Sequence, residues 1–247
     1  MKKLLNIFTV ILLVSCNSEN APDCFQNSGD IITKEFTVTP FTKITVFENV
    51  EMVITDAPDY KVTVATGEFL MSDIEVKVEG ERLKLYDNNG CNLTRDYGIT
   101  KIYVEAPNVE EIRSSTGLTI RSNGVLTYPT LKLLSEDNSG DFTRSGNFEI
   151  EVANQNLSVT VNALSTPIIS GTTDRLSLFY ASGDSRFEGR TLIAQEVNIF
   201  HRGTNDITVN PQIRLTANLV STGNVISVNT PADLDIQEQY TGRVIFE

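Results

Sequence analysis

Short runs of alternating hydrophobic and polar residues fill the second half of the chain and return at a nearly constant interval. Each run opens with Leu or Val, alternates for several residues, and ends in a polar segment that usually contains glycine. Alternation with a period of two predicts strands that bury one face. The runs begin at Leu131, Leu157, Leu176, Val197, Leu215 and Leu234.

Glycines mark the polar segments between these runs. The predicted corner glycines are Gly117, Gly140, Gly183, Gly203, Gly223 and Gly242. The last four are separated by 20, 20 and 19 residues, and Thr166 replaces glycine in one upstream copy. This period is too short for a four-stranded propeller blade and suits one coil of a parallel β-helix. Glycine is expected where the backbone turns sharply, often with a positive φ.

The first half of the chain carries the same alternation. Tight polar links separate the runs, and no linker long enough to divide domains interrupts residues 36–247. We therefore predict one all-β domain over residues 36–247, a parallel β-helix of roughly ten coils at about 20 residues per coil. Its predicted early strands are Phe36–Val38, Ile44–Phe47, Val50–Thr55, Lys61–Ala65, Ile74–Val78, Arg82–Tyr86 and Lys101–Glu105.

The first residues form an export signal. Lys2 and Lys3 precede the largely apolar stretch Leu4–Val14, which is short for a membrane span and typical of a secretory signal. The stretch ends in Leu-Val-Ser-Cys at residues 13–16, which resembles the bacterial lipobox. We predict a lipoprotein signal peptide at residues 1–15 and a lipidated N-terminus with a polar tether at residues 16–35. An ordinary signal peptide with a chance cysteine is the alternative.

The lipobox resemblance implies acylation at Cys16, with palmitate among the expected chains, and hence a membrane partner. Two or three acyl chains suffice for stable anchoring, whereas a single chain is marginal. Asn17 follows the cysteine in place of Asp, which favours the outer membrane. Whether the protein faces the periplasm or the exterior is left open.

Two cysteines remain after Cys16. Because exported proteins meet an oxidising compartment, Cys24 and Cys91 are predicted to form a disulfide that holds the N-terminal segment against the domain. Two cysteines and a single histidine, without a paired CxxC, do not make a structural zinc site.

The chain is acidic. Its net charge is −12 at pH 7, and loss of residues 1–15 removes two lysines and no acidic residue. This charge disfavours nucleic acid as a partner. The sequence contains no phosphate-binding or cofactor motif, so no cofactor is expected.

The residues Phe36–Tyr86 followed by glycine-punctuated repeats resemble the head GIN domain family of bacterial exported proteins, described as adhesin heads of autotransporters. The cysteine contexts Cys24-Phe25 and Cys91-Asn92, with the segment His201–Asp206, are similar to one lipoprotein branch of that family. The resemblance implies a single-stranded right-handed β-helix and assigns no catalytic residue. No translocator barrel is expected within this chain, which would in this respect depart from a true autotransporter.

These features support two functional hypotheses. The first is a lipid-anchored binding, adhesion or structural module of the cell envelope, without catalysis, whose surface contacts a glycan or protein ligand. The alternative is a polysaccharide lyase or hydrolase, because acids that project from neighbouring coils can form a glycosidase pair. Acidic residues at such corners are more often turn formers.

Five polar residues are the candidates for such surface chemistry, although none has a recognisable catalytic spacing. They are Asp141, Asp184, Arg186, His201 and Asp206. Asp137–Asp141 has oxygen ligands suited to calcium but lacks the calcium-binding repeat pattern, so no metal site is predicted.

Overall fold

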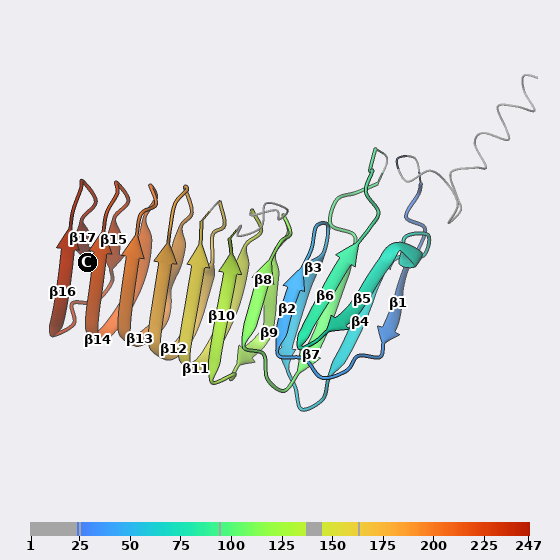
Figure 1. The fold of residues 1–247 in the computed structure, drawn as a ribbon, viewed down its shortest axis with the longest axis horizontal. Coiled ribbons are helices and arrows are strands. Elements are labelled where there is room, and N and C mark those ends of the chain that lie inside the picture. Colours follow the sequence, from blue (N-terminus) through green and yellow to red (C-terminus); the bar gives the residue numbers. More distant parts are fainter. Residues whose placement is uncertain (1–23, 25, 94, 137–144, 163) are drawn as a thin grey trace, which may run out of the picture.

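The computed structural model of the protein describes residues 24, 26–93, 95–136, 145–162 and 164–247. These residues form an elongated all-β structure in which 17 strands belong to one hydrogen-bonded sheet (Figure 1). A short 3-10 turn, η2, covers Met71–Asp73. The all-β class predicted from the alternation is therefore confirmed.

The strands fall into an early set of short strands and a later set dominated by long ones. The early strands are β1 (Ile31–Phe36), β2 (Lys43–Val46), β3 (Glu51–Asp56), β4 (Lys61–Gly67), β5 (Ile74–Glu79), β6 (Arg82–Asp87), β7 (Lys101–Ala106), β8 (Glu111–Ser114), β9 (Ile120–Leu126) and β10 (Thr130–Ser135). The later strands are β11 (Phe148–Val161), β12 (Ile168–Tyr180), β13 (Phe187–His201), β14 (Ile207–Leu219), β15 (Val225–Ser227), β16 (Asp233–Glu238) and β17 (Val244–Phe246).

The later strands stack in parallel, each beside the next one along the chain (Figure 1). Leu157 pairs with Leu176, Leu176 with Val197, and Val197 with Leu215. Leu131 and Leu234 extend the same row at its two ends. The six residues that open the predicted repeats are thus aligned in one row across the stack.

Each of the long strands β11 to β14 contributes to two parallel series of strands. Their second halves extend the series of paired strands β6–β2–β8–β10, and β16 follows at its end. Their first halves extend the series of paired strands β7–β3–β9, and β15 and β17 follow at its end. The two series enclose the core, because alternate residues of both point inward.

The core consists of rows of aliphatic side chains that follow the stack. Leu157, Leu176, Val197 and Leu215 are all nearly inaccessible to solvent, and so are their neighbours two residues along each strand. Burying one such side chain stabilises a fold by roughly 1.5–3 kcal/mol. The inward apolar residues of the alternating pattern, which predict these strands, therefore also make their main stabilising contacts.

The early strands depart from the predicted sequence of coils. β4 lies antiparallel between β1 and β7, and β5 lies antiparallel to β6. β2 inserts between β6 and β8, which follow it by several strands in the chain. The prediction of about ten successive coils over residues 36–247 is therefore wrong for this part. The tight links at residues 57–60 and 80–81 favour chain reversal, which antiparallel pairs require.

The boundary between tether and domain also differs from the prediction. β1 begins at Ile31, inside the segment predicted to be a tether, and most of its residues are exposed. Its antiparallel pairing with β4, rather than burial, defines it as a strand. Because hydrophobic alternation marks strands with one buried face, it does not predict an exposed strand such as β1.

Candidate functional site

The predicted corner glycines that the structure describes lie in the links between strands, but their roles differ from the prediction. Of those in the stacked links, only Gly183 has a positive φ, at 90°. At Gly223 a Cβ atom would overlap the carbonyl oxygen of Asn205 and the ring of His201. At Gly242 it would overlap the carbonyl oxygen of Gly223. Close approach of successive links, more than backbone conformation, therefore excludes a side chain at these two positions.

Gly117, another predicted corner glycine, does not show such close approach. A Cβ at Gly117 would meet only the Ser145 hydroxyl, at an ordinary contact distance of 3.5 Å. Gly140 lies outside the described residues, as do Asp141 and the predicted lipidation site Cys16.

The candidate acids Asp184 and Asp206 are engaged in bonds between neighbouring links. The Thr204 hydroxyl donates to Asp184 Oδ1 at 2.7 Å. The backbone and side-chain amides of Asn224 both donate to Asp206 Oδ1, each at 3.1 Å. These carboxylates therefore act as acceptors that fasten one link to the next, as expected of turn formers. Arg186 contributes its backbone carbonyl, which accepts a bond from the Tyr180 hydroxyl at 3.0 Å.

His201 is buried at the end of β13 and is not available to solvent. Its Nε2 lies 2.8 Å from the Asn205 carbonyl oxygen, and the Gly203 amide donates to Nδ1 at 3.4 Å. This pair of contacts fits the neutral imidazole with its proton on Nε2. Burial lowers the pKa of His201, while the Asn205 carbonyl and the charge of Asp206 partly oppose that shift. The side chain is therefore packed inside the stack and is held by contacts with its own link.

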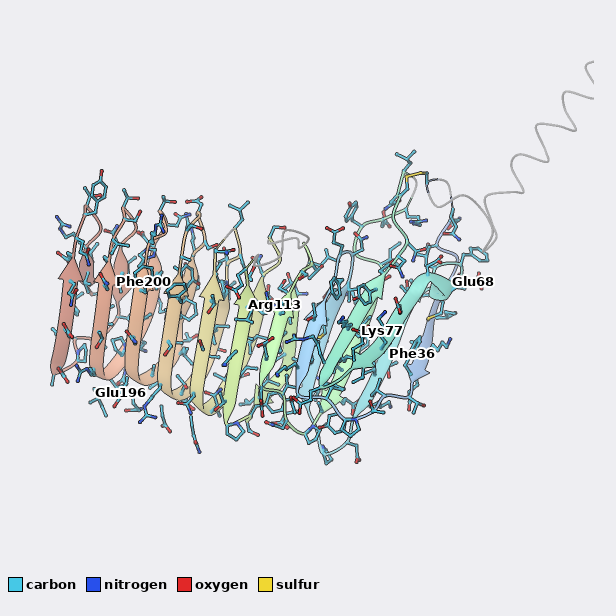
Figure 2. All side chains as sticks on the ribbon, viewed as in Figure 1. Phe36, Glu68, Lys77, Arg113, Glu196 and Phe200 are labelled. Carbon is cyan, nitrogen blue, oxygen red and sulfur yellow. A yellow bond between two sulfur atoms is a disulfide. The ribbon has the colours of Figure 1, made fainter. Side chains whose placement is uncertain are left out.

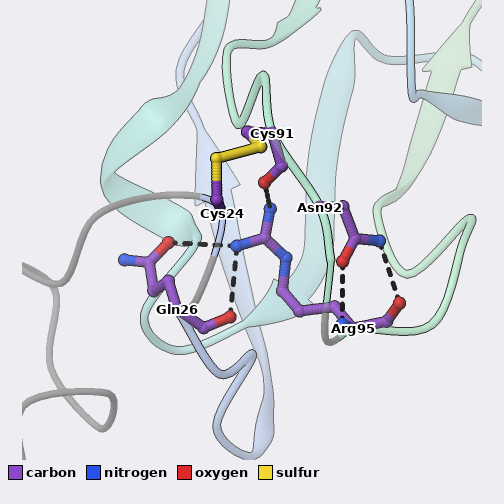
Figure 3. The surroundings of a disulfide bond; sticks show 5 residues. All are labelled: Cys24, Gln26, Cys91, Asn92 and Arg95. Atoms are coloured by element: carbon purple, nitrogen blue, oxygen red, sulfur yellow. Dashed lines mark hydrogen bonds between the residues drawn. A yellow bond between two sulfur atoms is a disulfide. The ribbon is translucent and has the colours of Figure 1, made fainter.

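The predicted disulfide between Cys24 and Cys91 is present and joins the N-terminal segment to the loop after β6 (Figure 3). The Arg95 guanidinium donates to the Cys91 carbonyl at 2.9 Å and to the Gln26 carbonyl at 3.3 Å. Asn92 Oδ1 accepts from the Arg95 amide at 2.7 Å. Arg95 thus connects the two segments that the disulfide joins.

A separate feature lies on the outer face of the stack, where the strand register places side chains in rows. One row contains Lys132, Ser158, Ser177, Asn198, Thr216 and Asp235. The row two residues earlier along the strands contains Asn156, Arg175, Glu196, Arg214 and Asp233. The row two residues later contains Leu134, Thr160, Phe179, Phe200, Asn218 and Gln237. In Figure 2, Glu196 and Phe200 lie toward opposite ends of the outer segment of β13.

A trough follows the middle row across β12, β13 and β14. A hollow of about 410 Å³ has Ser177, Asn198 and Thr216 in its lining, with Arg175, Glu196 and Arg214 along one side. A second hollow, of about 280 Å³, shares Arg175 and Glu196 with the first and extends past them. We call this continuous depression the polar trough. Short side chains lie between longer ones, so the surface is hollowed along the direction of stacking.

The polar trough is not evident from the sequence alone. Its signal is present in the repeats, because aligning their opening residues also aligns the polar positions between them. The corner segments carry the more conspicuous pattern, whereas the outward positions of the strands look like ordinary exposed residues.

A small cavity of about 60 Å³ lies beside the disulfide loop, with Asp87 and Asn89 in its lining, and is too small for a sugar residue. Within the described part of the chain there is no cluster of three or more His, Cys, Asp or Glu side chains suited to a metal ion. No helix among those residues is long and apolar enough to cross a membrane.

Comparison with known proteins gives one family. Residues 40–231 match the family model described as "putative auto-transporter adhesin, head GIN domain". No curated protein matches the chain significantly.

Several solved structures share the fold. A "putative adhesin" from Bacteroides fragilis has a TM-score of 0.77 at 19% identity, covering 88% of this chain and 97% of its own. A "putative adhesin" from Parabacteroides distasonis has a TM-score of 0.63 at 14% identity, covering 89% of this chain and 98% of its own. A "putative lipid binding protein" from the same species has a TM-score of 0.59 at 18% identity, covering 88% and 97% of the two chains.

Proposed function

Since the chain belongs to the head GIN domain family, we propose that it is an exported binding module of the cell envelope that acts by adhesion rather than catalysis. The observation that carries the proposal is the outer face of the stack, where side chains are aligned in rows across neighbouring strands. Such a face offers the same kind of contact repeatedly along an elongated body. The descriptions of the family and of the structural neighbours as adhesins agree with this role.

We propose further that the stack is a single-stranded right-handed parallel β-helix. The spacing of equivalent residues supports this proposal. The aligned residues Leu157, Leu176, Val197 and Leu215 are separated by 19, 21 and 18 residues, close to the predicted period. The antiparallel strands β1, β4 and β5 belong to the other end of the molecule and differ from that arrangement.

The attachment to the envelope is proposed to be a lipid anchor at Cys16. Its support is the sequence alone: a charged start, an apolar stretch and a lipobox-like ending at residues 13–16. Asn17 favours the outer membrane. The disulfide between Cys24 and Cys91 would then hold the domain close to the anchor.

The enzymatic alternative has little support in the geometry. Asp184 and Asp206 each accept bonds from the neighbouring link, which accounts for their presence without a substrate. His201 is buried, and its contacts with Asn205 and Gly203 account for its presence without a substrate.

The proposed function is tested with the full chain, purified in detergent and labelled, and with a strain that lacks it. Saturable binding to whole cells, isolated envelopes or host cell surfaces is expected, together with weaker adhesion of the deletion strain. Heat-denatured protein is the control for non-specific attachment. An absence of binding to all of these surfaces, with unchanged adhesion of the deletion strain, would contradict the proposal.

A further inference from the structure

We propose that the polar trough binds a neutral polysaccharide, with the chain lying along the direction in which β12, β13 and β14 stack. This inference rests on the proposed binding function and specifies its surface and ligand class. The hollow that contains Ser177, Asn198 and Thr216 has a volume of about 410 Å³ and continues into the second hollow beside Arg175 and Glu196.

The floor of the trough has the chemistry that sugar hydroxyls require. Sugar hydroxyls both donate and accept hydrogen bonds, and Ser, Thr and Asn side chains do the same. Within the described residues, the side chains of Ser177 and Asn198 make no hydrogen bond to the protein and are exposed. Thr216 accepts a long bond from Arg214 at 3.3 Å and keeps its own proton for another acceptor. The floor therefore presents unsatisfied donors and acceptors to a ligand.

An aromatic pair borders the same floor on its other side. Phe179 and Phe200, two residues beyond Ser177 and Asn198 on the same strands, stack with ring centroids 5.0 Å apart. Phe179 is 47% exposed, although its ring is apolar. Pyranose rings combine hydroxyl edges with C–H faces, so a sugar matches a surface where polar and aromatic rows adjoin.

The charges of the trough favour a neutral ligand over an acidic one. Arg175 pairs with Glu196 at 3.4 Å, and Arg214 pairs with Asp233 at 3.0 Å. Opposite charges therefore alternate along this side of the trough, where each of these two arginines is paired with a carboxylate. The whole chain carries −12, which repels polyanions further.

The position of the trough distinguishes a polysaccharide from an extended peptide. Peptides that bind to sheets bond to the free backbone groups of an open edge. β12 and β13 are paired on both sides, and β14 lies between β13 and β16, so this surface is a face without an open edge. Recognition here must come from side chains. Neighbouring strands lie about 4.8 Å apart, which is close to the length of one pyranose residue, so successive sugars would meet equivalent side chains.

The proposal is tested by binding of the full chain, in detergent, to immobilised dextran, mannan, laminarin and xylan, with alginate and polygalacturonate as acidic comparisons. The variants are a double substitution F179A/N198A, which removes contacts, and Ser177→Arg, which fills the trough. Matched controls are Ile193→Ala and Ser170→Arg, because Ile193 is 43% exposed and both residues belong to the half-strands of the other series. Far-ultraviolet circular dichroism and the melting temperature identify any variant that fails to fold.

We expect saturable binding to at least one neutral polysaccharide, at least tenfold weaker in both trough variants and unchanged in both controls. Binding of only the acidic polymers, binding unaffected by the trough variants, or no binding to any of the glycans would overturn the inference. If the trough variants still adhere to cells or envelopes as the wild type does, the inference fails while the proposed adhesive function stands. If neither glycans nor surfaces are bound, both fail.

Discussion

Gly223 lies at a point where two links of the stack approach each other closely. Replacing it by Ala would place a methyl group against the Asn205 carbonyl and the His201 ring, neither of which is at the free end of a flexible side chain. We expect Gly223→Ala to lower the free energy of unfolding by about 1–3 kcal/mol, the usual cost of an overpacked site. Urea unfolding measures this loss.

Gly117→Ala is the matched control for this substitution. Gly117 is also a predicted corner glycine, but its added Cβ would be 3.5 Å from the Ser145 hydroxyl, an ordinary contact. We expect a change within about 0.5 kcal/mol, as for most surface substitutions. Equal losses in the two variants would show that close approach is not what Gly223 provides.

His201 makes the stability of the protein depend on pH. Burial lowers its pKa in the folded state, so the unfolded chain takes up a proton first as the pH falls. The stability contributed by neutral His201 is therefore complete above about pH 6.5, the ordinary value, and declines below it until the lowered pKa is reached.

The single histidine allows a direct measurement of this effect. Titration of its ring protons by NMR is expected to give a pKa below 6.5. In urea unfolding, His201→Gln is expected to reduce the loss of stability between neutral and mildly acidic pH. A ring that titrates at or above the ordinary value would contradict the burial argument.

At the scale of elements, the disulfide holds the segment before β1 against the loop that follows β6. Cys24 and Cys91 are separated by 67 residues, so their bond restricts a large loop of the unfolded chain. We expect C24S/C91S to lose roughly 2–4 kcal/mol of unfolding free energy. Treating the wild type with reductant is expected to produce a similar loss in urea unfolding, whereas reductant should leave the double variant unchanged. A double variant as stable as the oxidised wild type would contradict this role.

The strands differ in how well the sequence predicts them. The alternating runs of β10 to β16 stack on their immediate neighbours, so the period in the sequence is also the period in space. β2 pairs instead with β6 and β8, and these partners are distant in the chain. Alternation identifies β2 as a strand but carries no information about which strand it joins. Such long-range pairing depends on the whole fold and leaves no local pattern.

The candidate site shows the same contrast. Cys24 and Cys91 could be paired from cysteine counting and the compartment alone. Predicting the polar trough would require the knowledge that Ser177, Asn198 and Thr216 are neighbours in space. Each of these residues by itself is an ordinary exposed polar position of a strand. Their arrangement becomes recognisable only when the exact register is known, because a slip of one residue would turn them toward the core.

At the scale of the whole molecule, the described N-terminal segment lies at one end of an elongated body. The series of strands extends away from the end that contains β1 and the disulfide (Figure 1). The polar trough lies on β12 to β14, further along the stack. An anchor before residue 24 would therefore attach the protein at one end and leave the trough distant from the point of attachment.

The anchor itself gives the last prediction. Replacing Cys16 by Ser removes the thiol that the lipobox resemblance assigns to acylation, while Cys24→Ser removes a nearby cysteine and keeps that thiol. Two or more acyl chains anchor a protein stably in a bilayer, and a protein without them lacks that anchor. We therefore expect Cys16→Ser to leave the membrane fraction and to lose palmitate labelling. Wild type and Cys24→Ser are expected to enter the detergent phase on phase separation and to incorporate labelled palmitate. Equal labelling of Cys16→Ser and wild type would place the lipid elsewhere, and absence of label from both would favour an ordinary signal peptide.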